Sequence, residues 1–334
     1  MRRKNDLNSV LLLTWDEPKL NITGIMNEQL TDTVLMIRPS NFGFNEEAFL
    51  SNSFQNKPSE DEVESIQKLA LAEFDRYVDE LRTLNVEVIV FDDFPNSISP
   101  DSIFPNNWIS MHSNGKLYQH SMLVSNRRKE RREDIVNYFE LNYGYRSEDL
   151  SGTELLNEAK FLEGTGSMIF DHKTKKIYAA ISPRTNPELV DSFAKKIGYE
   201  SIQFEAYGGK GEAIYHTNVM LCIGDQFAVV GLDTIKESQR NLVRQHLEKS
   251  GKAIIELSND QVYASFAGNM LQLKNKNDER IIVMSQSAYG SLTKGQIDQL
   301  KTFNNHLLAA NIPIIEKVGG GSARCMLAEV FKPI

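Results

Sequence analysis

The fold of this chain is decided by residues 219–257, which read VMLCIGDQFAVVGLDTIKESQRNLVRQHLEKSGKAIIEL. Two short apolar runs flank a turn at Gly224-Asp225, and this pattern predicts a β-hairpin. An amphipathic segment over 234–250 follows and stops before Gly251, as expected of a helix. The β-rich run at 253–257 then predicts a third strand. The stretch is therefore interpreted as hairpin, helix and strand.

The same order of elements recurs along the chain, and capping-box pairs begin two of the predicted helices, Ser59 with Glu62 and Thr293 with Gln296. The helix starts are spaced by roughly 50 to 70 residues, as in supersecondary repeats. Five such units without a Pro- or Ser-rich linker predict one closed, propeller-like α/β domain. A doubly wound sheet is the alternative, which the hairpins disfavour. Further hairpins are expected at 108–123, 168–181 and 270–284, helices at about 59–84, 127–142, 186–198 and from 293 to before 313, and strands at 86–91, 201–206 and 312–318.

Composition indicates an ordinary soluble globular protein. The 334 residues are 41% hydrophobic and 25% charged, with a formal net charge of −8. A nucleic-acid-binding domain usually carries a basic face, so no nucleic-acid partner is expected. The basic run at 127–132 is interpreted as the solvated face of a helix start. No stretch approaches the length of a membrane span, so no membrane partner is expected either.

The two cysteines, Cys222 and Cys325, are too few for a disulfide framework and fit a reducing cytoplasm. Cys222 lies in an apolar run and is expected to be a small buried hydrophobe. Residues 1–32 differ in pattern from the rest of the chain. They are expected to form a loosely ordered extension ahead of a single domain over 33–334, with Met26 as an alternative start.

Four loops are rich in chemically active side chains, and each precedes a predicted strand. In a pseudo-symmetric fold such loops gather at one end of a central channel. The last of them, residues 319–325, joins three glycines to Arg324 and Cys325. A nearby guanidinium favours the reactive thiolate, although an incidental cysteine in a flexible turn is an equally simple interpretation. The other three loops are residues 101–108, 163–167 and 216–220.

Cys325, His216 and Glu163 together make a possible nucleophile, acid/base and orienting carboxylate. Each also has a structural interpretation, since His216 fits a core histidine and Glu163 fits a turn. Asn106 and Asn107 fit turn caps in the same way. The shared position of the loops favours the joint catalytic interpretation.

The order of Glu163-Gly164, His216-Thr217-Asn218 and the 319–326 turn resembles the guanidino-group-modifying enzymes, the pentein superfamily. This superfamily includes arginine deiminases, dimethylarginine hydrolases and amidinotransferases. The runs at 36–45 and 104–108 look most like the citrulline-utilisation hydrolase type. The resemblance implies an α/β, five-bladed ββαβ propeller with pseudo-fivefold symmetry over 33–334. It also implies that Cys325 is the nucleophile, His216 the acid/base and Glu163 its partner.

Two departures from the deiminase pattern concern the substrate. Asn107 and Asn218 stand where deiminases carry the aspartates that clamp a guanidinium. Burying that cation without paired carboxylates costs on the order of several kcal/mol, which outweighs the ~1 kcal/mol that a neutral hydrogen bond contributes. A neutral ureido group has no such demand, and asparagine can both donate to it and accept from it. The pocket is therefore expected to suit citrulline better than arginine. The alternative is that Asp101 or another acid restores the negative charge that a guanidinium requires.

The hypothesis is attack by Cys325 on the ureido carbon of L-citrulline, giving ornithine, ammonia and carbon dioxide. Glu163, Asn107 and Asn218 are expected to hold the ureido nitrogens and oxygen, and Asn106 is expected to bind the substrate as well. Arg184 resembles the arginine that holds the substrate carboxylate in deiminases, and Arg324 is a second candidate for that role.

Arginine deimination and amidino transfer by the same three residues are the enzymatic alternatives. A non-catalytic binding protein on this scaffold ranks below them. No Cys or His ligand spacing indicates a metal, so neither metal nor cofactor is expected. The expected partner is a small amino acid, and the sequence does not predict the oligomeric state.

Overall fold

The computed structural model describes residues 28–95 and 98–334, and these form five three-stranded mixed sheets. The predicted N-terminal extension falls mainly on residues 1–27, which lie outside the described residues. The α/β class is confirmed. In each sheet the middle strand pairs antiparallel with one neighbour and parallel with the other. This pairing is what a hairpin followed by a helical crossover produces.

The stretch at 219–257 forms one such unit. It contains β9 (Leu221–Ile223), β10 (Phe227–Val230), α6 (Glu237–Lys249) and β11 (Ala253–Glu256). Val229 pairs with Cys222 on one side and Ile255 on the other. Three other units follow the same order. One contains β3 (Ile109–Met111), β4 (Lys116–Gln119), α3 (Glu133–Tyr143) and β5 (Arg146–Asp149), and the next contains β6 (Ile169–Asp171), β7 (Lys176–Ala180), α5 (Pro187–Ile197) and β8 (Glu200–Phe204). The last contains β12 (Leu271–Lys274), β13 (Arg280–Ser285), two helices, α8 (Gln286–Ser291) and α9 (Lys294–Phe303), and β14 (His306–Ala310).

The first sheet joins segments far apart in the sequence. It contains β1 (Thr33–Arg38), α2 (Glu60–Thr83) and β2 (Glu87–Asp92), and β15 (Ala328–Glu329) completes it. β1 runs parallel to β2 and antiparallel to β15, so β15 takes the place that a hairpin strand takes in the other sheets.

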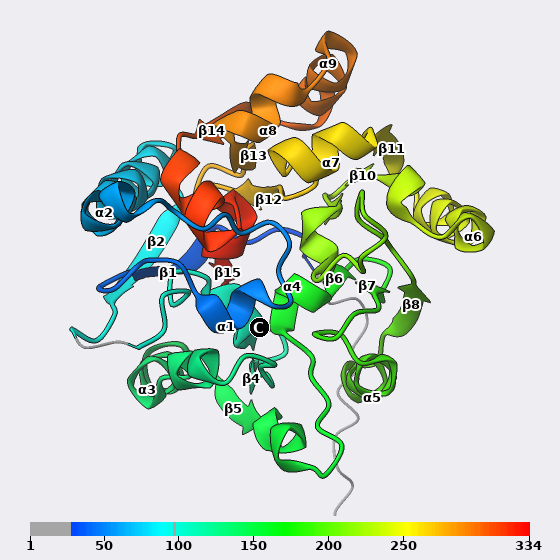
Figure 1. Cartoon of the computed structure of the whole chain (residues 1–334). Helices are drawn as coiled ribbons and strands as arrows, with labels where there is room; N and C mark the ends of the chain where they lie inside the picture. The colour runs from blue at the N-terminus through cyan, green and yellow to red at the C-terminus, as the bar shows by residue number, and fades with distance from the viewer. Residues whose placement is uncertain (1–27, 96–97) are drawn as a thin grey trace, which may run out of the picture.

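The sheets lie around a common centre, with α2, α3, α5, α6 and α9 toward the outside (Figure 1). Each sheet has one end strand that contacts the end strand of another sheet: β6 contacts β9, β9 contacts β12, and β15 contacts β3. These end strands lie nearest the centre. Every position of β9 and β10 is buried. The hydrophobic core therefore lies between each sheet and its outer helix as well as between sheets.

Local sequence signals explain where several helices begin. Both predicted capping boxes are present, at Ser59 with Glu62 and at Thr293 with Gln296. Asn186 caps α5, whose first residue is Pro187, a position that tolerates the missing N–H. Among the described residues, no helix is both long and apolar enough to cross a membrane.

Two local predictions are wrong. Residues 313–319 are helical, with a π-helical turn at Ile315–Gly319, while the strand is the preceding β14. Glu73 of α2 accepts hydrogen bonds from the N–H groups of Ile314 and Ile315, which satisfies the start of this turn. The predicted helix at 127–142 begins at Glu133 (α3), and Asn126–Glu130 forms a separate 3-10 turn.

Candidate active site

Five short segments converge at one end of the centre, each just before the first strand of a sheet. Four correspond to the predicted loops: η1 (Pro105–Asn107), α4 (Gly164–Ser167), η4 (Thr217–Val219) and η7 (Ala323–Met326). α4 contacts both η1 and η4, and η1 contacts η7. The fifth segment, residues 267–270, precedes β12 and was not singled out from the sequence. The predicted pseudo-equivalent positions are thus brought together.

Glycine allows this close approach in α4. Gly164 has φ +44°, and a Cβ there would lie 2.4 Å from the carbonyl oxygen of Asn106. A side chain would therefore push η1 away and strain the backbone. The Glu163-Gly164 pair thus places the carboxylate beside η1 and η4.

A small cavity with a volume of about 10 Å³ lies where the segments meet. Its polar lining includes Cys325, His216, Asn107, Asp101, Arg127 and Arg184.

Glu163 and His216 form a buried pair. Glu163 Oε2 lies 2.7 Å from His216 Nε2 and 3.3 Å from Arg184 Nη1, and its other oxygen accepts from the N–H of Leu123. Burial alone would raise the pKa of the Glu163 carboxyl, but the Arg184 guanidinium and the His216 hydrogen bond hold it well below its usual range. Burial lowers the pKa of His216 to about 4, against the opposing influence of Glu163. At neutral pH the pair is therefore a carboxylate beside a neutral imidazole.

Cys325 lines the same cavity and is only 3% exposed. Its Sγ accepts from the side-chain amides of Asn218 at 3.4 Å and Asn269 at 3.2 Å. Burial raises the pKa of the Cys325 thiol, and the two amides act in the opposite direction. Since His216 lines the same cavity, a proton acceptor is available to the thiol.

Arg127 is a site residue that the sequence interpretation missed. It is 2% exposed, pairs with Glu130 at 2.8 Å, and donates from Nη1 to Asn107 Oδ1 at 2.8 Å. The signal in the sequence was Glu130, three residues later, which supplies a buried cation with its counter-ion. Because Arg127 occupies the amide oxygen of Asn107, the Asn107 nitrogen is left as a donor, and it bonds Asn106 Oδ1 at 3.1 Å.

The other predicted amides have unused groups. Asn106 Nδ2 and Asn218 Oδ1 are buried and have no hydrogen-bond partner among the described residues. Asp101 shares this property, since its Oδ1 is unpaired within residues 28–95 and 98–334 while Oδ2 accepts from Asn45 at 2.8 Å. Burial raises the pKa of Asp101. Buried groups of this kind are candidates for bonds to a ligand.

Arg184 lies in the cavity wall beneath the segment around α1 (Glu46–Phe49). It donates to Ser51 Oγ at 2.8 Å, and its guanidinium lies 5.2 Å from the centre of the Tyr215 ring. Asn52 donates to the Gly320 carbonyl, which ties the same segment to the cysteine turn. α1 accordingly lies in front of the centre in Figure 1.

Arg324 was the second arginine predicted to bind the substrate carboxylate. Its guanidinium does not line this cavity. It donates to the Leu327 carbonyl at 2.8 Å and to Glu329 at 2.9 Å. With Glu329 and Cys222 it lines a second cavity instead. The reason is local, because β15 places Glu329 within reach of the guanidinium.

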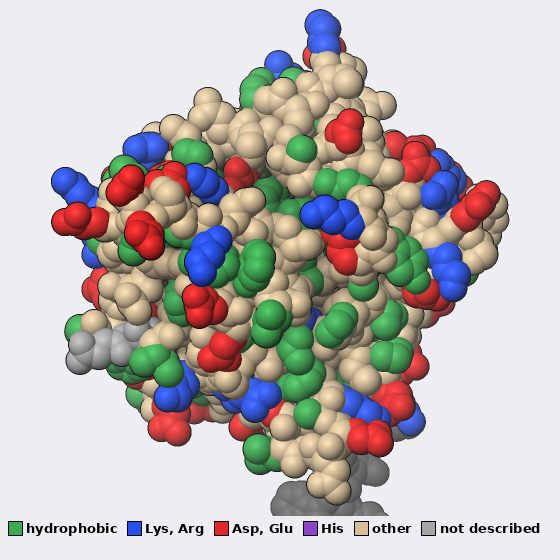
Figure 2. Space-filling view, in the orientation of Figure 1, with side chains coloured by type: hydrophobic (Ala, Val, Ile, Leu, Met, Phe, Trp, Pro, Cys, Tyr) green, Lys and Arg blue, Asp and Glu red, His purple; other side chains and the backbone are tan. Residues whose placement is uncertain are grey.

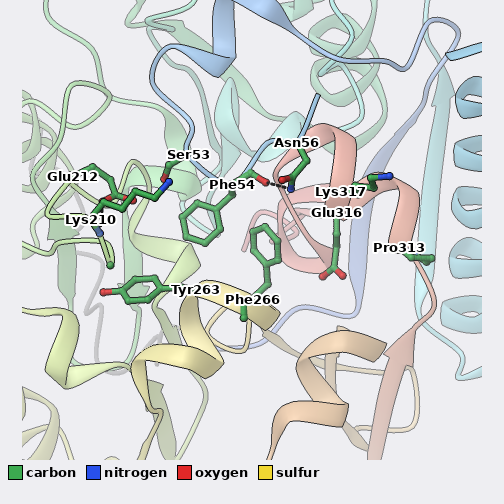
Figure 3. Close-up of a pocket in the computed structure, with 12 residues that line it drawn as sticks. Ser53, Phe54, Asn56, Lys210, Glu212, Tyr263, Phe266, Pro313, Glu316 and Lys317 are labelled. Carbon is green, nitrogen blue, oxygen red and sulfur yellow. Dashed lines mark hydrogen bonds between the residues drawn. The ribbon is translucent and has the colours of Figure 1, made fainter. Parts of the chain in front are cut away.

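The surface around the site is mixed in character. On the face in Figure 2, basic and acidic side chains are interspersed, and hydrophobic ones gather near the middle. Figure 3 shows a more open pocket beside the cavity, where the rings of Phe54 and Phe266 lie close together. Phe54 lines the open pocket and also contacts Tyr215, which lines the cavity that contains Cys325. The open pocket's lining contains neither cysteine nor histidine.

Within the described parts of the chain, no group of three or more His, Cys, Asp and Glu side chains is arranged to hold a metal ion. The expectation of a cofactor-free site stays a prediction.

Comparison with known proteins places this site in context. A family model described as eukaryotic N,N dimethylarginine dimethylhydrolase matches residues 38–332. The match includes Glu163, His216 and Cys325. A search of curated protein sequences gives no match.

Solved structures share the fold at low sequence identity. The N-terminal domain of ArgZ, an arginine dihydrolase from Cyanobacteria, is 15% identical with a TM-score of 0.68, covering 90% of this chain and 99% of that one. Unliganded AgrE is 15% identical with a TM-score of 0.70, covering 90% and 39%. A dimethylarginine dimethylaminohydrolase adduct with S-methyl-L-thiocitrulline is 15% identical with a TM-score of 0.59, covering 90% and 99%.

Proposed function

The chain belongs to the eukaryotic N,N-dimethylarginine dimethylhydrolase family, within the pentein superfamily of guanidino-modifying hydrolases. We propose that this member hydrolyses the ureido group of L-citrulline. The observation that carries this choice is the surroundings of Cys325 Sγ. Its two side-chain hydrogen-bond donors are the neutral amides of Asn218 and Asn269. Asn218 Oδ1, which has no partner among the described residues, can accept from a neutral ureido group, and neither amide offers a guanidinium a counter-ion.

The proposed site is carried by one domain over residues 33–334. In this proposal the five sheets are the blades of an α/β propeller, and β15 completes the blade that β1 begins. Each blade then contributes the segment before its first strand to a shared central cavity. Support comes from the repeated strand order and from the contacts among η1, α4, η4 and η7.

Substrate binding uses the charged groups of the cavity. The substrate carboxylate binds Arg184, because a guanidinium offers paired donors in the geometry of a carboxylate. The substrate ammonium binds the unpaired Oδ1 of Asp101. Asn107 donates to the ureido oxygen through the nitrogen that Arg127 leaves available. The unpaired Oδ1 of Asn218 accepts from a ureido N–H.

The chemistry starts with transfer of the Cys325 proton to His216 and attack of sulfur on the ureido carbon. Glu163, 2.7 Å from His216, stabilises the imidazolium that forms. A C–N bond breaks as His216 protonates the departing nitrogen. His216 then activates water, which cleaves the S–C bond of the acyl intermediate. The second C–N bond breaks as the carbamic acid decomposes, so citrulline and one water give ornithine, ammonia and carbon dioxide.

Product analysis tests this proposal. Purified protein is given citrulline, arginine and dimethylarginine separately, and ornithine, citrulline and ammonia are quantified. Ornithine and ammonia in equal amounts from citrulline are expected, with Cys325→Ala as the inactive control. Citrulline formed from a guanidino substrate, with citrulline itself left intact, would overturn the choice of substrate.

A guanidino substrate is the second candidate, and Asp101 is the observation that favours it. Asp101 lines the same cavity and has an unpaired carboxylate oxygen within the described residues, although its other oxygen already lies 3.7 Å from Arg127 Nε. Asn218→Asp separates the two candidates, because it places a carboxyl group beside Sγ. We expect it to lower citrulline turnover and to raise the ratio of guanidino to ureido hydrolysis. Asn56→Asp, on the protein surface, is the matched control and should leave that ratio unchanged.

A further inference from the structure

Asn269 is a buried polar residue to which the mechanism above gives no step. It lies in the segment before β12, at the position equivalent to those of η1, α4, η4 and η7, and is 0% exposed. Its side chain contacts both Cys325 and the backbone that carries Asn218. Any role for Asn269 in the chemistry rests on the proposed role of Cys325 as the nucleophile.

The orientation of the Asn269 amide is determined by its partners. Oδ1 accepts from the backbone N–H of Arg324 at 3.0 Å, and that group is only a donor. The amide nitrogen must therefore face the other side. There it lies 2.9 Å from the Asn218 carbonyl oxygen and 3.2 Å from Cys325 Sγ. One N–H of Asn269 is thus directed at the sulfur whatever the protonation state of the thiol.

The backbone around Asn269 is held tightly against η4. A Cβ on Gly268 would lie 2.5 Å from the Val219 carbonyl oxygen, so only glycine permits this approach. Phe266 has φ +52°, an unfavourable conformation for a bulky residue, and its carbonyl accepts from the Asn269 N–H at 2.8 Å. Strain of this kind is often found at functional sites and persists only when surrounding contacts enforce it.

Asn218 differs from Asn269 in this respect. Its nitrogen is 3.4 Å from Sγ, and its oxygen has no partner among the described residues. Asn218 is therefore available to the substrate, whereas both ends of Asn269 are already engaged.

We propose that Asn269 is a catalytic residue, which stabilises the thiolate of Cys325 through a fixed hydrogen bond and holds the sulfur in position for attack. A hydrogen bond to a charged acceptor is stronger than one to a neutral acceptor, so this contact strengthens when the thiol loses its proton. The division of roles follows: Asn269 serves the sulfur and Asn218 serves the substrate.

The test measures the thiol directly and needs no substrate. Alkylation of Cys325 by iodoacetamide is followed against pH in the full chain, with mass spectrometry assigning the modified cysteine. In Asn269→Ala the apparent pKa of Cys325 should rise and alkylation at neutral pH should slow by about 10-fold, the scale expected for one hydrogen bond to a charged group. kcat should fall by a similar factor with KM nearly unchanged.

Asn269→Asp distinguishes the hydrogen bond from a loss of packing. Aspartate keeps the acceptor for the Arg324 N–H but, when ionised, presents an oxygen to the sulfur. Its alkylation should therefore slow at least as much as in Asn269→Ala. Asn275→Ala is the matched control, because Asn275 is buried and holds a turn through the Leu84 carbonyl and Glu279. It should lower stability without changing the alkylation profile.

An alkylation profile unchanged in both folded Asn269 variants would overturn the inference. If Asn269→Ala does not fold, the Asn269→Asp profile decides alone. Failure of the proposed function is seen separately, as citrulline hydrolysis that survives in Cys325→Ala. If Cys325→Ala is inactive and the alkylation profiles of the Asn269 variants are unchanged, only the role of Asn269 is contradicted.

Discussion

The two cysteines of this chain are alike in burial and differ in surroundings. Cys222 and Cys325 are each 3% exposed, and both thiols are free. Burial raises the pKa of both, to about 12 for Cys222. By these measures they are equivalent, and neither would be singled out as reactive.

The difference lies in what touches each sulfur. Cys222 belongs to β9, where it pairs with Val229 inside the hydrophobic core. Cys325 lies in a turn, accepts hydrogen bonds from two amides and faces a cavity that also contains His216. Burial alone therefore does not distinguish a structural thiol from a nucleophile. Directed side-chain donors to the sulfur do, since each cysteine lines a cavity that also contains a histidine.

Replacement of each cysteine gives the largest expected contrast. Cys325→Ala should lower citrulline hydrolysis by at least about 10⁴-fold, because the nucleophile is lost. Cys222→Ala should keep activity and lose about 1–2 kcal/mol of unfolding free energy through a small core cavity. Initial rates and urea unfolding measure the two effects. Comparable activity losses in both variants would remove the distinction drawn between the two sites.

Each cysteine also has a buried carboxylate–arginine pair nearby, and the two pairs give the next contrast. Glu163→Gln removes the charge beside His216 and leaves Arg184 without its anionic partner. Activity should fall by about 10²- to 10⁴-fold, and stability by about 3–5 kcal/mol. Glu329→Gln breaks the Arg324 pair on the Cys222 side. It should cost comparable stability but much less activity, as steady-state kinetics and urea unfolding will show. Equal activity losses would mean that Glu163 acts only by supporting the fold.

The smallest expected effect is the pH dependence of the unfolding free energy. A buried histidine lines each cysteine's cavity, and the two histidines should contribute alike. Burial lowers the pKa of His216, beside Cys325, and of His172, beside Cys222, to about 4. The unfolded chain takes up these protons near pH 6.5, so the unfolding free energy should fall between pH 6.5 and about 4. The loss is up to about 1.4 kcal/mol per pH unit for each histidine.

Glu163 acts at lower pH, because its depressed pKa preserves its contribution until the pH falls below the unfolded value near 4.3. Urea unfolding at pH 7, 6 and 5 measures the slope. His172→Asn and His216→Asn should each flatten it by a similar amount. A slope unchanged in both variants would contradict the neutral state of the buried imidazoles.

Much of the fold is predictable from the sequence because its signals are local. Hairpin turns, capping boxes and helical periodicity each span a few residues, and they recur in each unit. The helical turn at Ile315–Gly319 is not predictable in this way, since Glu73, 241 positions from Ile314, satisfies its first N–H groups. An apolar run of this length fits a strand or a helix equally well until such a partner is known.

The residues of the candidate site also fall into those that local sequence signals predict and those that depend on distant partners. Cys325, His216 and Glu163 were predicted from their position in repeated units and from a family resemblance, and the structure brings them to one region. Arg127 was missed because an arginine in a basic run is usually solvated, and only Glu130 and Asn107 make its burial possible. Asn269 was missed although its segment is the fifth member of the series. The repeat itself, applied once more, would have found it.

The pairing of β1 with β15 bears on the order in which the molecule folds. Thr31 and Val330, 299 positions apart in the sequence, meet beside this pairing. Closing so long a loop costs entropy that is offset only after the intervening units have organised. The turn that carries Cys325 directly precedes β15, so we expect the Cys325 thiol to reach its position late in folding. Partly folded molecules should thus hold most of the secondary structure while Cys325 is still exposed to solvent.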